Sequence, residues 1–279
     1  MLTESLHHWL SPMMFIRLRQ LRYAPLELVD RLTGRYEPLL PPRWLHFVGA
    51  GDFRTVGERF LGYFREIGGL QPHESVLDVG CGVGRMALPL TRYLLPRASY
   101  RGFDIVKPAI DWCQARISPC YPNFQFVHAN IQNDEYNPRG HDRAEHYHFP
   151  YDDASFDFIF LTSVFTHMLP AGMRNYLGEM KRVLRPNGRI FVTAFLLDEI
   201  SIAHMNSEAS LFHFKDSGKG YWTTHLQRPE AATAYTLAAL RAMVEDAGLR
   251  IIEPIHWGNW SSRSASVEGQ DILLLTHAA

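Results

Sequence analysis

The sequence contains little cysteine, and its cysteines form no metal-binding pattern. Cys81, Cys113 and Cys120 are spread over 279 residues, so paired metal-ligand spacing is absent and any disulfide would leave an odd thiol. Such usage is typical of a reducing compartment, and we expect a cytoplasmic protein. The first residues also lack the basic start and apolar stretch of a secretory signal.

Long apolar runs and an excess of one charge are also missing. No run of 18 or more apolar residues occurs, so we expect no transmembrane helix. The 28 Lys and Arg residues nearly balance the 29 Asp and Glu residues, which argues against a general nucleic-acid or membrane-surface binder and leaves only local basic patches open. With 46% hydrophobic residues, the chain can build one sizeable α/β domain with appendages, or two small domains.

The most informative segment is a glycine-rich turn between a strand pattern and a helix pattern. Gly80, Gly82 and Gly84 are spaced G-x-G-x-G, and glycine lets a backbone turn sharply and approach a ligand. The following helix N-terminus offers amide donors. A dinucleotide fingerprint needs a small residue where Arg85 stands, and Asp78 would repel a pyrophosphate. We therefore expect a ligand that carries a cationic amino group.

This segment resembles motif I of the class I S-adenosylmethionine-dependent methyltransferases, in which the loop wraps the amino-acid end of the cofactor. The resemblance implies S-adenosyl-L-methionine as cofactor and S-adenosyl-L-homocysteine as product. Further segments look like a bacterial subgroup of these enzymes that accompanies glycosyltransferases in surface-polysaccharide or glycolipid biosynthesis. They cover residues 51–53, 103–105, 111–113, 121–124, 136–138, 163–168 and 270–272.

Strand patterns alternate with helix patterns from residue 53 onward, which predicts a parallel sheet covered by helices on both faces. The last two strands are joined by a loop without a helix, so the final strand is expected to be antiparallel. The prediction is an α/β, Rossmann-like, doubly wound sheet of seven strands, within a methyltransferase domain over residues 53–279. Strands are expected at 75–79, 100–104, 124–129, 156–161, 189–195, 249–256 and 271–276, and helices at 54–68, 85–95, 108–117, 171–184 and 231–247.

Two segments stand apart from this regular pattern. Residues 1–52 are predicted to form an N-terminal extension of short helices and a proline-rich connector. Its basic amphipathic part either packs on the domain or on a second subunit, which leaves a homodimer open, or makes peripheral contact with a membrane. Residues 197–229 are expected to form a lid-like insertion, because long loops are usually functional.

Residues that end the strands are expected to hold the cofactor, because doubly wound sheets bind ligands at that edge. Asp104 follows Gly84 by 20 residues, near the spacing at which an acid binds ribose hydroxyls. The resemblance puts Asn130 against the adenine amino group, with an ordinary turn residue as the alternative. The predicted cofactor-binding residues are Asp78, Gly80, Cys81, Gly82, Gly84, Arg85, Asp104, Ile105, Asn130, Ile131 and Ser163.

His167 is the predicted catalytic base. Residues 161–170 resemble the segment after the fourth strand in small-molecule methyltransferases, where a histidine often faces the substrate. Methyl transfer is an SN2 displacement at a sulfonium methyl group, so the protein has to align the reactants and activate the nucleophile. Histidine suits a hydroxyl nucleophile near neutral pH. The alternative is a supporting or helix-capping histidine, with the base elsewhere, for example at His204 or Tyr136.

Aromatic side chains interleaved with hydrogen-bonding groups are expected to shape the acceptor site. They suit a sugar or another polyhydroxyl compound, and would also suit a planar aromatic acceptor. His141, His146 and His148 lie close in sequence but without a companion carboxylate pattern, so no metal is expected. The predicted acceptor-binding residues are Tyr136, His204, Tyr221, Trp222, Trp257, Trp260 and Arg263.

The sequence thus predicts O-methylation of a hydroxyl group on a sugar, glycolipid or polysaccharide. One alternative is an O- or N-methyltransferase of natural products, with an aromatic or carboxylate acceptor. Another is an inactive cofactor-binding scaffold subunit. A nucleic-acid methyltransferase is disfavoured, because residues 162–165 read Thr-Ser-Val-Phe instead of the Asn/Asp-Pro-Pro-Tyr type of motif.

Overall fold

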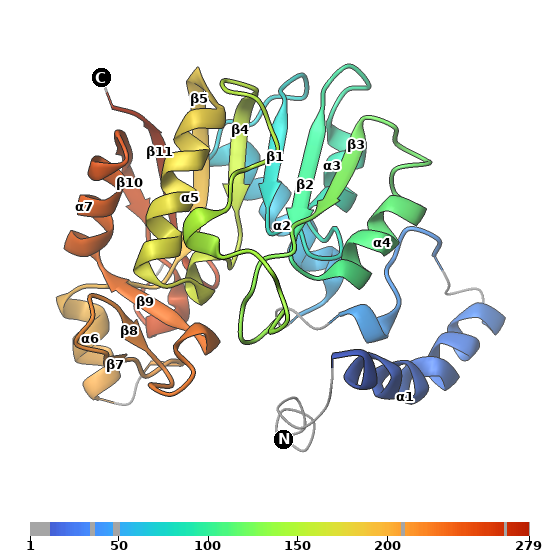
Figure 1. Cartoon of the computed structure of the whole chain (residues 1–279), viewed down its shortest axis with the longest axis horizontal. Coiled ribbons are helices and arrows are strands. Elements are labelled where there is room, and N and C mark those ends of the chain that lie inside the picture. The colour runs from blue at the N-terminus through green and yellow to red at the C-terminus, as the bar shows by residue number, and fades with distance from the viewer. Residues whose placement is uncertain (1–11, 34–36, 47–50, 208–209, 265–266, 279) are drawn as a thin grey trace.

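The main sheet of the molecule has seven strands in the order β10-β11-β5-β4-β1-β2-β3. The computed structural model describes residues 12–33, 37–46, 51–207, 210–264 and 267–278. β11 runs antiparallel to both of its neighbours, so the predicted sheet with an antiparallel last strand is confirmed (Figure 1). The strands are β1 (Val76–Val79), β2 (Tyr100–Asp104), β3 (Phe124–His128), β4 (Phe156–Leu161), β5 (Leu184–Ala194), β10 (Leu249–His256) and β11 (Asp271–His277).

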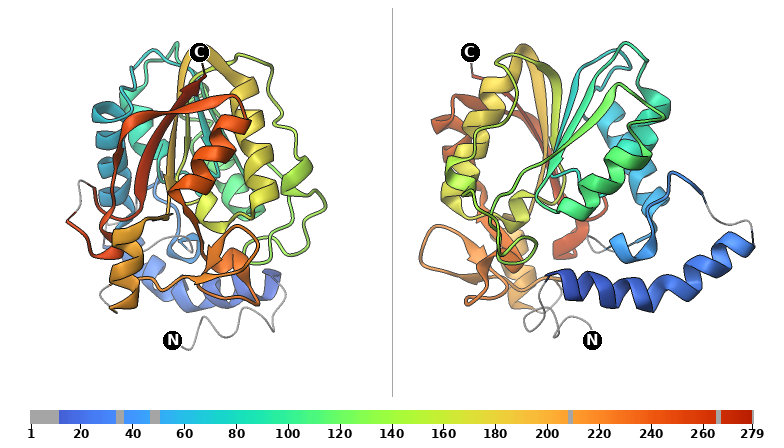
Figure 2. Two further views of the ribbon diagram at one scale, coloured as in Figure 1. Left: turned by 90° about the vertical axis from the view of Figure 1, so that its left-hand side faces the viewer. Right: turned by 45° about the vertical axis from the view of Figure 1, so that its right-hand side comes forward.

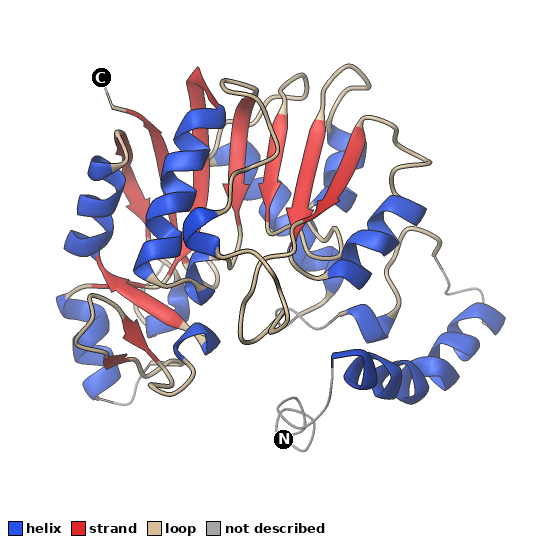
Figure 3. Ribbon diagram, in the orientation of Figure 1, coloured by secondary structure: helices blue, strands red, loops and turns tan. Residues whose placement is uncertain are grey.

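Helices cover both faces of this sheet (Figure 3), and each face has its own apolar core beneath its helices. In β4, Ile159 and Leu161 belong to one core and Phe158 and Phe160 to the other, as expected of a strand buried on both faces. The helices over the second core are α2 (Phe53–Glu66), α3 (Ala87–Tyr93) and α4 (Lys107–Arg116), and those over the first are α5 (Pro170–Val183) and α7 (Leu237–Asp246).

Two of the expected elements differ from those in the structure. Leu184 pairs with Phe156 and Arg189 with Phe158, so residues 185–188, which separate the expected helix from the expected strand, form a bulge inside β5. The helix expected at 231–247 begins only at residue 237, and β9 (Thr233–Thr236) precedes it. β-branched and aromatic residues favour a strand in β9, and Thr236 caps the helix by accepting a hydrogen bond from the Ala239 amide at 3.2 Å.

The insertion after β5 is folded rather than a simple loop. It contributes to a second sheet with the order β6-β9-β8-β7, which lies beside α6 at the lower left of Figure 1. A small apolar core of its own includes Phe195, Phe214 and Trp260. The remaining elements here are β6 (Leu196–Leu197), α6 (Glu199–Asn206), β7 (Lys215–Asp216) and β8 (Trp222–Thr223).

The N-terminal extension contains one long helix, α1 (Pro12–Leu32), instead of several short ones. Figures 1 and 2 show from different sides that α1 lies below the edge of the sheet at which the carboxyl ends of the parallel strands meet. The expected extension also includes residues 1–11, which lie outside the described residues. Short 3-10 turns complete the chain: η1 (Arg43–Leu45), η2 (Ala144–His146), η3 (Phe165–His167), η4 (Pro229–Ala231) and η5 (Asn259–Ser261).

Among the residues that the structure describes, no helix combines the length and apolar character needed to cross a lipid bilayer.

Candidate active site

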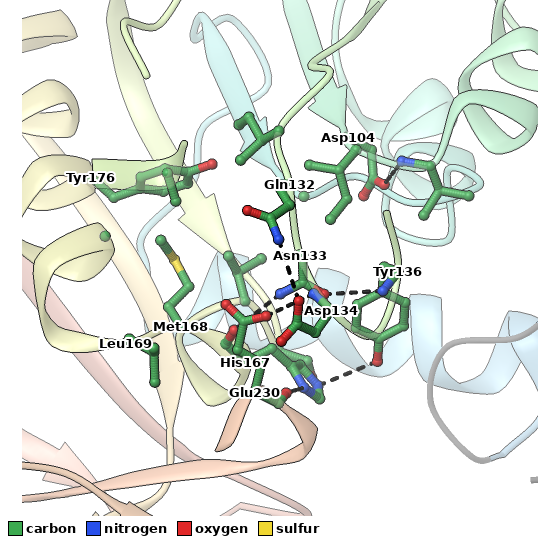
Figure 4. Close-up of a pocket in the computed structure, with 18 of the residues that line it drawn as sticks. Asp104, Gln132, Asn133, Asp134, Tyr136, His167, Met168, Leu169, Tyr176 and Glu230 are labelled. Carbon is green, nitrogen blue, oxygen red and sulfur yellow. Dashed lines mark hydrogen bonds between the residues drawn. The ribbon is translucent and has the colours of Figure 1, made fainter. Parts of the chain in front are cut away.

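A cavity of about 350 Å³ lies where the carboxyl ends of the central strands meet (Figure 4). The loops after β1, β2, β3 and β4 line it, together with α5 and the turns η2 and η4. This is the edge at which doubly wound sheets bind ligands. From the predicted set, the cavity brings together Gly80, Gly82, Asp104, Ile105, Ile131, Tyr136, Ser163 and His167.

The three glycines in the turn after β1 meet different steric requirements. Gly80 has φ +81°, and a Cβ there would meet Val164 Cγ2 at 2.4 Å, so a larger residue would displace the loop. Gly82 has φ +52° and lines the cavity with no atom within 4 Å of the place a Cβ would take. A Cβ on Gly84 would meet Ile117 Cδ1 at 2.8 Å. The first two glycines therefore form the cavity wall, and the third allows α4 to pack closely.

Asp78 is fully buried with half of its hydrogen-bonding capacity unused. The Tyr100 hydroxyl donates to Oδ2 at 2.5 Å, whereas Oδ1 is buried without a partner among the described residues. Burial raises the pKa of this carboxyl well above its usual range, against the opposing effect of the Tyr100 hydrogen bond. Asp78 lies behind Gly80 and does not line the cavity itself, but a buried acid with an orphaned oxygen at this place fits a ligand that brings a cationic amino group.

Asp104 projects from the end of β2 into the same cavity. Its Oδ2 accepts a hydrogen bond from the Gly82 amide at 2.7 Å, and its Oδ1 accepts one from the Val106 amide at 2.8 Å. Each carboxylate oxygen keeps a lone pair for another donor. Burial raises the pKa of this group, while the two amides oppose the rise. The glycine turn and a pair of carboxylate oxygens are thus held at one place, which fits the vicinal hydroxyls of a ribose.

The remaining predicted cofactor residues fall into two groups. Ile105, Ile131 and Ser163 line the cavity, and Ser163 has φ +61°, an uncommon conformation for a non-glycine residue. Asn130 is exposed outside the lining, and its Oδ1 accepts from Asn137 Nδ2 at 3.3 Å, as an ordinary turn residue does. Also outside the lining, Cys81 is buried and Arg85 stacks on the Phe53 ring.

His167 lies in the cavity with its tautomer determined by its surroundings. Its Nδ1 is 2.8 Å from the backbone carbonyl oxygen of Glu230, which can only accept, so Nδ1 carries the proton. The lone pair on Nε2 then faces the Tyr136 hydroxyl at 3.5 Å, a separation too long for a strong hydrogen bond. Burial lowers the pKa of the ring, so the neutral, proton-accepting form is favoured.

Carboxyl and amide groups surround His167 on one wall of the cavity. The Glu230 carboxylate accepts a hydrogen bond from the Asp134 amide at 2.8 Å. Burial raises the pKa of Glu230, as does the nearby Asp134 carboxylate, whereas the Asp134 amide lowers it. Burial also raises the pKa of Tyr136 to about 12, so its hydroxyl stays protonated. Gln132 and Asn133 extend this polar wall.

The opposite wall is apolar. Figure 4 shows Tyr176, Met168 and Leu169 on the side of the cavity away from Asp104 and Tyr136. Tyr176 and Met168 are buried, and Tyr176 belongs to the core under α5. The cavity can therefore hold a molecule with one polar and one apolar side.

The structure places most of the predicted acceptor-binding residues outside this cavity. Trp260 is 2% exposed, and its indole N–H donates to Asp271 Oδ2 at 2.8 Å. His204 Nδ1 lies 2.7 Å from the Ser261 carbonyl oxygen. The others also pack within the insertion and around it: Tyr221 is buried, Trp222 contacts the small core, and Arg263 pairs with Asp198 and stacks over Trp257.

Several residues that line the cavity were not predicted from the sequence. Gln132 and Tyr176 lie in the middle of their segments without a motif, and Glu230 lies just beyond the expected end of the insertion. Only the fold brings Glu230 against His167, 63 residues away in the chain. The one available signal was the position of Glu230 between the end of the expected insertion and the predicted helix that follows it. Among the described residues, no three His, Cys, Asp or Glu side chains gather as a metal-binding set.

Comparison with known proteins identifies the central domain. Residues 77–192 match a family model described as a methyltransferase domain. The chain is 29% identical over 153 residues to the methyltransferase GfsG of Streptomyces halstedii, covering 53% of this chain and 49% of that protein. It is 30% identical over 147 residues to the O-methyltransferase cnsE of Penicillium expansum, covering 52% and 46%. The chain thus spans about half the length of these curated relatives.

A solved structure extends the likeness to the whole fold. The PH0226 protein of Pyrococcus horikoshii OT3 superposes with a TM-score of 0.55 at 14% identity, covering 88% of this chain and 97% of that one. The family model thus matches a methyltransferase domain at residues 77–192, and the solved structure confirms the Rossmann-like doubly wound fold around it.

Proposed function

We propose that this protein transfers a methyl group from S-adenosyl-L-methionine to a hydroxyl oxygen on a sugar, glycolipid or polysaccharide. The observation that carries the proposal is His167, whose Nδ1 faces a backbone carbonyl oxygen so that Nε2 keeps its lone pair inside the cavity. The cofactor, when bound, supplies an electrophilic methyl carbon on a sulfonium. The protein then has to orient an acceptor and take up one proton.

The cofactor would bind across the glycine turn and the end of β2. Gly80 and Gly82 leave room for its amino-acid end, and the unpaired Oδ1 of Asp78 would take the amino group. The Asp104 carboxylate would accept from the ribose hydroxyls. Ile105 and Ile131 would flank the adenine. These assignments follow from the chemistry of the groups present and from their common edge of the sheet.

His167 would act as the general base. Nε2 would accept the proton of the acceptor hydroxyl as its oxygen attacks the methyl carbon. The ring would then be an imidazolium that keeps its Nδ1–H hydrogen bond to the Glu230 carbonyl oxygen. The Glu135 carboxylate, whose charge opposes the lowering of the His167 pKa, would stabilise this positive charge.

The polar wall supports an acceptor with several hydroxyl groups. Carboxylates and side-chain amides accept hydrogen bonds from hydroxyls, and Gln132, Asn133, Asp134 and Glu230 supply both kinds of group. A glycan acceptor would also agree with the resemblance to methyltransferases that accompany glycosyltransferases.

The apolar wall favours a second candidate, a natural product with a planar or aliphatic part. Tyr176, Met168 and Leu169 would contact such an acceptor, and one relative is named as an O-methyltransferase. Because the chain spans about half of these relatives, their names alone do not decide between the two.

A methyl-transfer assay with radiolabelled cofactor tests the proposal. The purified protein is first titrated with S-adenosyl-L-methionine and S-adenosyl-L-homocysteine, with NAD as a control, and then supplied with glycans, lipid-linked glycans and planar aromatic compounds. Binding of both sulfur ligands and label in a glycan fraction are the expected results. Label only in the aromatic compounds would favour the second candidate. Cofactor binding without turnover on any acceptor would favour an inactive scaffold, and no binding would overturn the reading of the glycine turn.

A further inference from the structure

Helix α1 turns its polar side toward the rest of the chain. Its half-buried residues Arg19, Tyr23, Glu27 and Asp30 are separated by four, four and three positions, so they form one stripe along the helix. The guanidinium of Arg19 donates to the Trp44 and His46 carbonyl oxygens, both at 2.9 Å. Asp30 accepts from Arg43 at the same stretch of chain. Polar groups thus make the contacts that hold α1.

The opposite side of α1 is apolar and exposed. Leu18, Leu21, Leu28, Val29 and Leu32, here called the outer stripe, follow spacings of three, seven, one and three. At 3.6 residues per turn these positions share one side of the helix, away from Arg19 and Asp30. Leu21 and Leu32 are 72% and 78% exposed. A surface helix normally buries its apolar side, so α1 has the reverse orientation, and its apolar side lacks a cover within the described chain.

The position of α1 indicates what covers the outer stripe. α1 and the insertion both extend beyond the edge of the sheet that holds the cavity, as the views from different sides agree (Figures 1 and 2). The insertion also exposes large apolar side chains at this end of the molecule: Ile200, Leu211, Phe212 and Leu226. A flat lipid surface can meet two separate elements at once, whereas a second copy of the chain would need a matching contour for each.

The charge of α1 points to the same partner. Its sequence contains Arg17, Arg19, Arg22 and Arg31 against Glu27 and Asp30, although the whole chain carries a formal net charge of −1. Arg22 is exposed one helical turn from Leu18 and next to Leu21. A helix with an exposed apolar stripe bordered by basic residues binds the interface of a membrane that contains anionic lipid.

We propose that the outer stripe of α1 docks on the surface of an anionic membrane. The five apolar side chains insert among the lipid headgroups and upper acyl chains, and Arg22 pairs with lipid phosphates. Docking holds the end of the molecule that bears the cavity near the lipid surface. The binding itself requires neither the cofactor nor an acceptor, so it stands apart from the proposed function.

Vesicle flotation of the full chain tests this proposal. Vesicles of phosphatidylcholine are compared with vesicles in which phosphatidylglycerol makes up about a third of the lipid. The unmodified protein is expected to float with the anionic vesicles. The double variant Leu21→Gln/Leu32→Gln is expected to lose about tenfold or more in partitioning, because binding scales with inserted apolar area. Arg22→Gln should lose a few-fold on anionic vesicles only.

A matched control separates the stripe from the helix as a whole. Leu26→Gln makes the same kind of replacement at an exposed leucine outside the outer stripe and should float nearly like the unmodified protein. Circular dichroism checks that all variants keep their helix content. Absence of flotation for the unmodified protein, or equal flotation of the outer-stripe and control variants, would overturn the proposal. Sedimentation velocity tests whether a second copy of the chain covers the outer stripe instead. If the unmodified protein is a dimer that Leu21→Gln/Leu32→Gln dissociates, and if it does not bind vesicles, the stripe belongs to a dimer interface.

Discussion

The two sides of the cavity differ in how far local sequence determines them. On the cofactor side, the glycine turn and Asp104 line the cavity directly after their own strands. On the insertion side, Trp260 and Tyr221 were expected at the acceptor and are instead buried. A strand end projects a residue to a fixed edge of the sheet, whereas an insertion can fold on itself. Proximity to an active-site rim in sequence is therefore a weaker guide than a position at a strand end.

The insertion is stabilised by an aromatic core, two of whose residues, Phe195 and Trp260, lie outside residues 197–229. β6, β7 and β8 have only two residues each, and such short strands cannot stabilise a sheet through backbone pairing alone. Phe195 and Phe214 pack against Trp260 with ring centroids 5.2 and 5.7 Å apart. Asp271 binds the Trp260 indole and the Gly258 and Leu196 amides, each at 2.8 Å. This core joins the insertion to β11.

The largest expected effect is on catalysis and concerns His167. This residue follows β4, whereas its hydrogen-bond partner, the Glu230 carbonyl oxygen, lies where the insertion ends. His167→Ala should lower kcat by about 10²–10⁴ if Nε2 is the base, with cofactor affinity unchanged because the ring lies apart from the glycine turn. Steady-state kinetics and calorimetric titration measure the two quantities. His73→Ala, at an exposed turn before β1, is the control. A rate for His167→Ala within a few-fold of the control would move the base elsewhere.

A stability measurement tests the structural role of the insertion aromatics. Trp260→Ala should lower the free energy of unfolding by about 3–5 kcal/mol, since it empties a large volume in a packed core. Trp222→Ala should cost clearly less, because Trp222 is only half-buried. Urea denaturation of both variants provides the comparison. If Trp260→Ala kept its stability and raised only the KM of the acceptor, Trp260 would be a substrate contact after all.

On the cofactor side, a smaller loss is expected from Asp104. Asp104→Ala should weaken S-adenosyl-L-methionine binding by about 1.5–3 kcal/mol, the size of charged hydrogen bonds to the ribose. Asp111→Ala removes an exposed carboxylate from α4 and should leave the affinity unchanged. Calorimetry on both variants decides the matter. Equal affinities would show that Asp104 supports only the Gly82 and Val106 amides.

The sequence was sufficient for the parts of the fold that local patterns control. The alternation of strands and helices and the antiparallel β11 follow from periodicity and connection type. The position of Asp104 at the cavity was predicted from its spacing to Gly84. The pairing of His167 with the Glu230 carbonyl oxygen could not be predicted, because it depends on how the insertion returns to the sheet. The strand β9 was missed since Ala231 and Ala232 begin a segment that also suits a helix.

The smallest expected effect is on the pH dependence of kcat/KM. This measurement tests whether burial or hydrogen bonding controls the pKa of His167. Burial lowers the pKa of His167 below its ordinary value of 6.5. The base must be neutral, so the rate should stay high as pH falls to 6.5 and decline only at lower pH. Tyr136→Ala would admit water beside Nε2 and move the decline toward 6.5. Tyr136→Phe keeps the ring that covers His167 and should leave the profile unchanged. A shift in Tyr136→Phe as large as that in Tyr136→Ala would mean that the tyrosine hydroxyl, and not burial, controls the ionisation of His167.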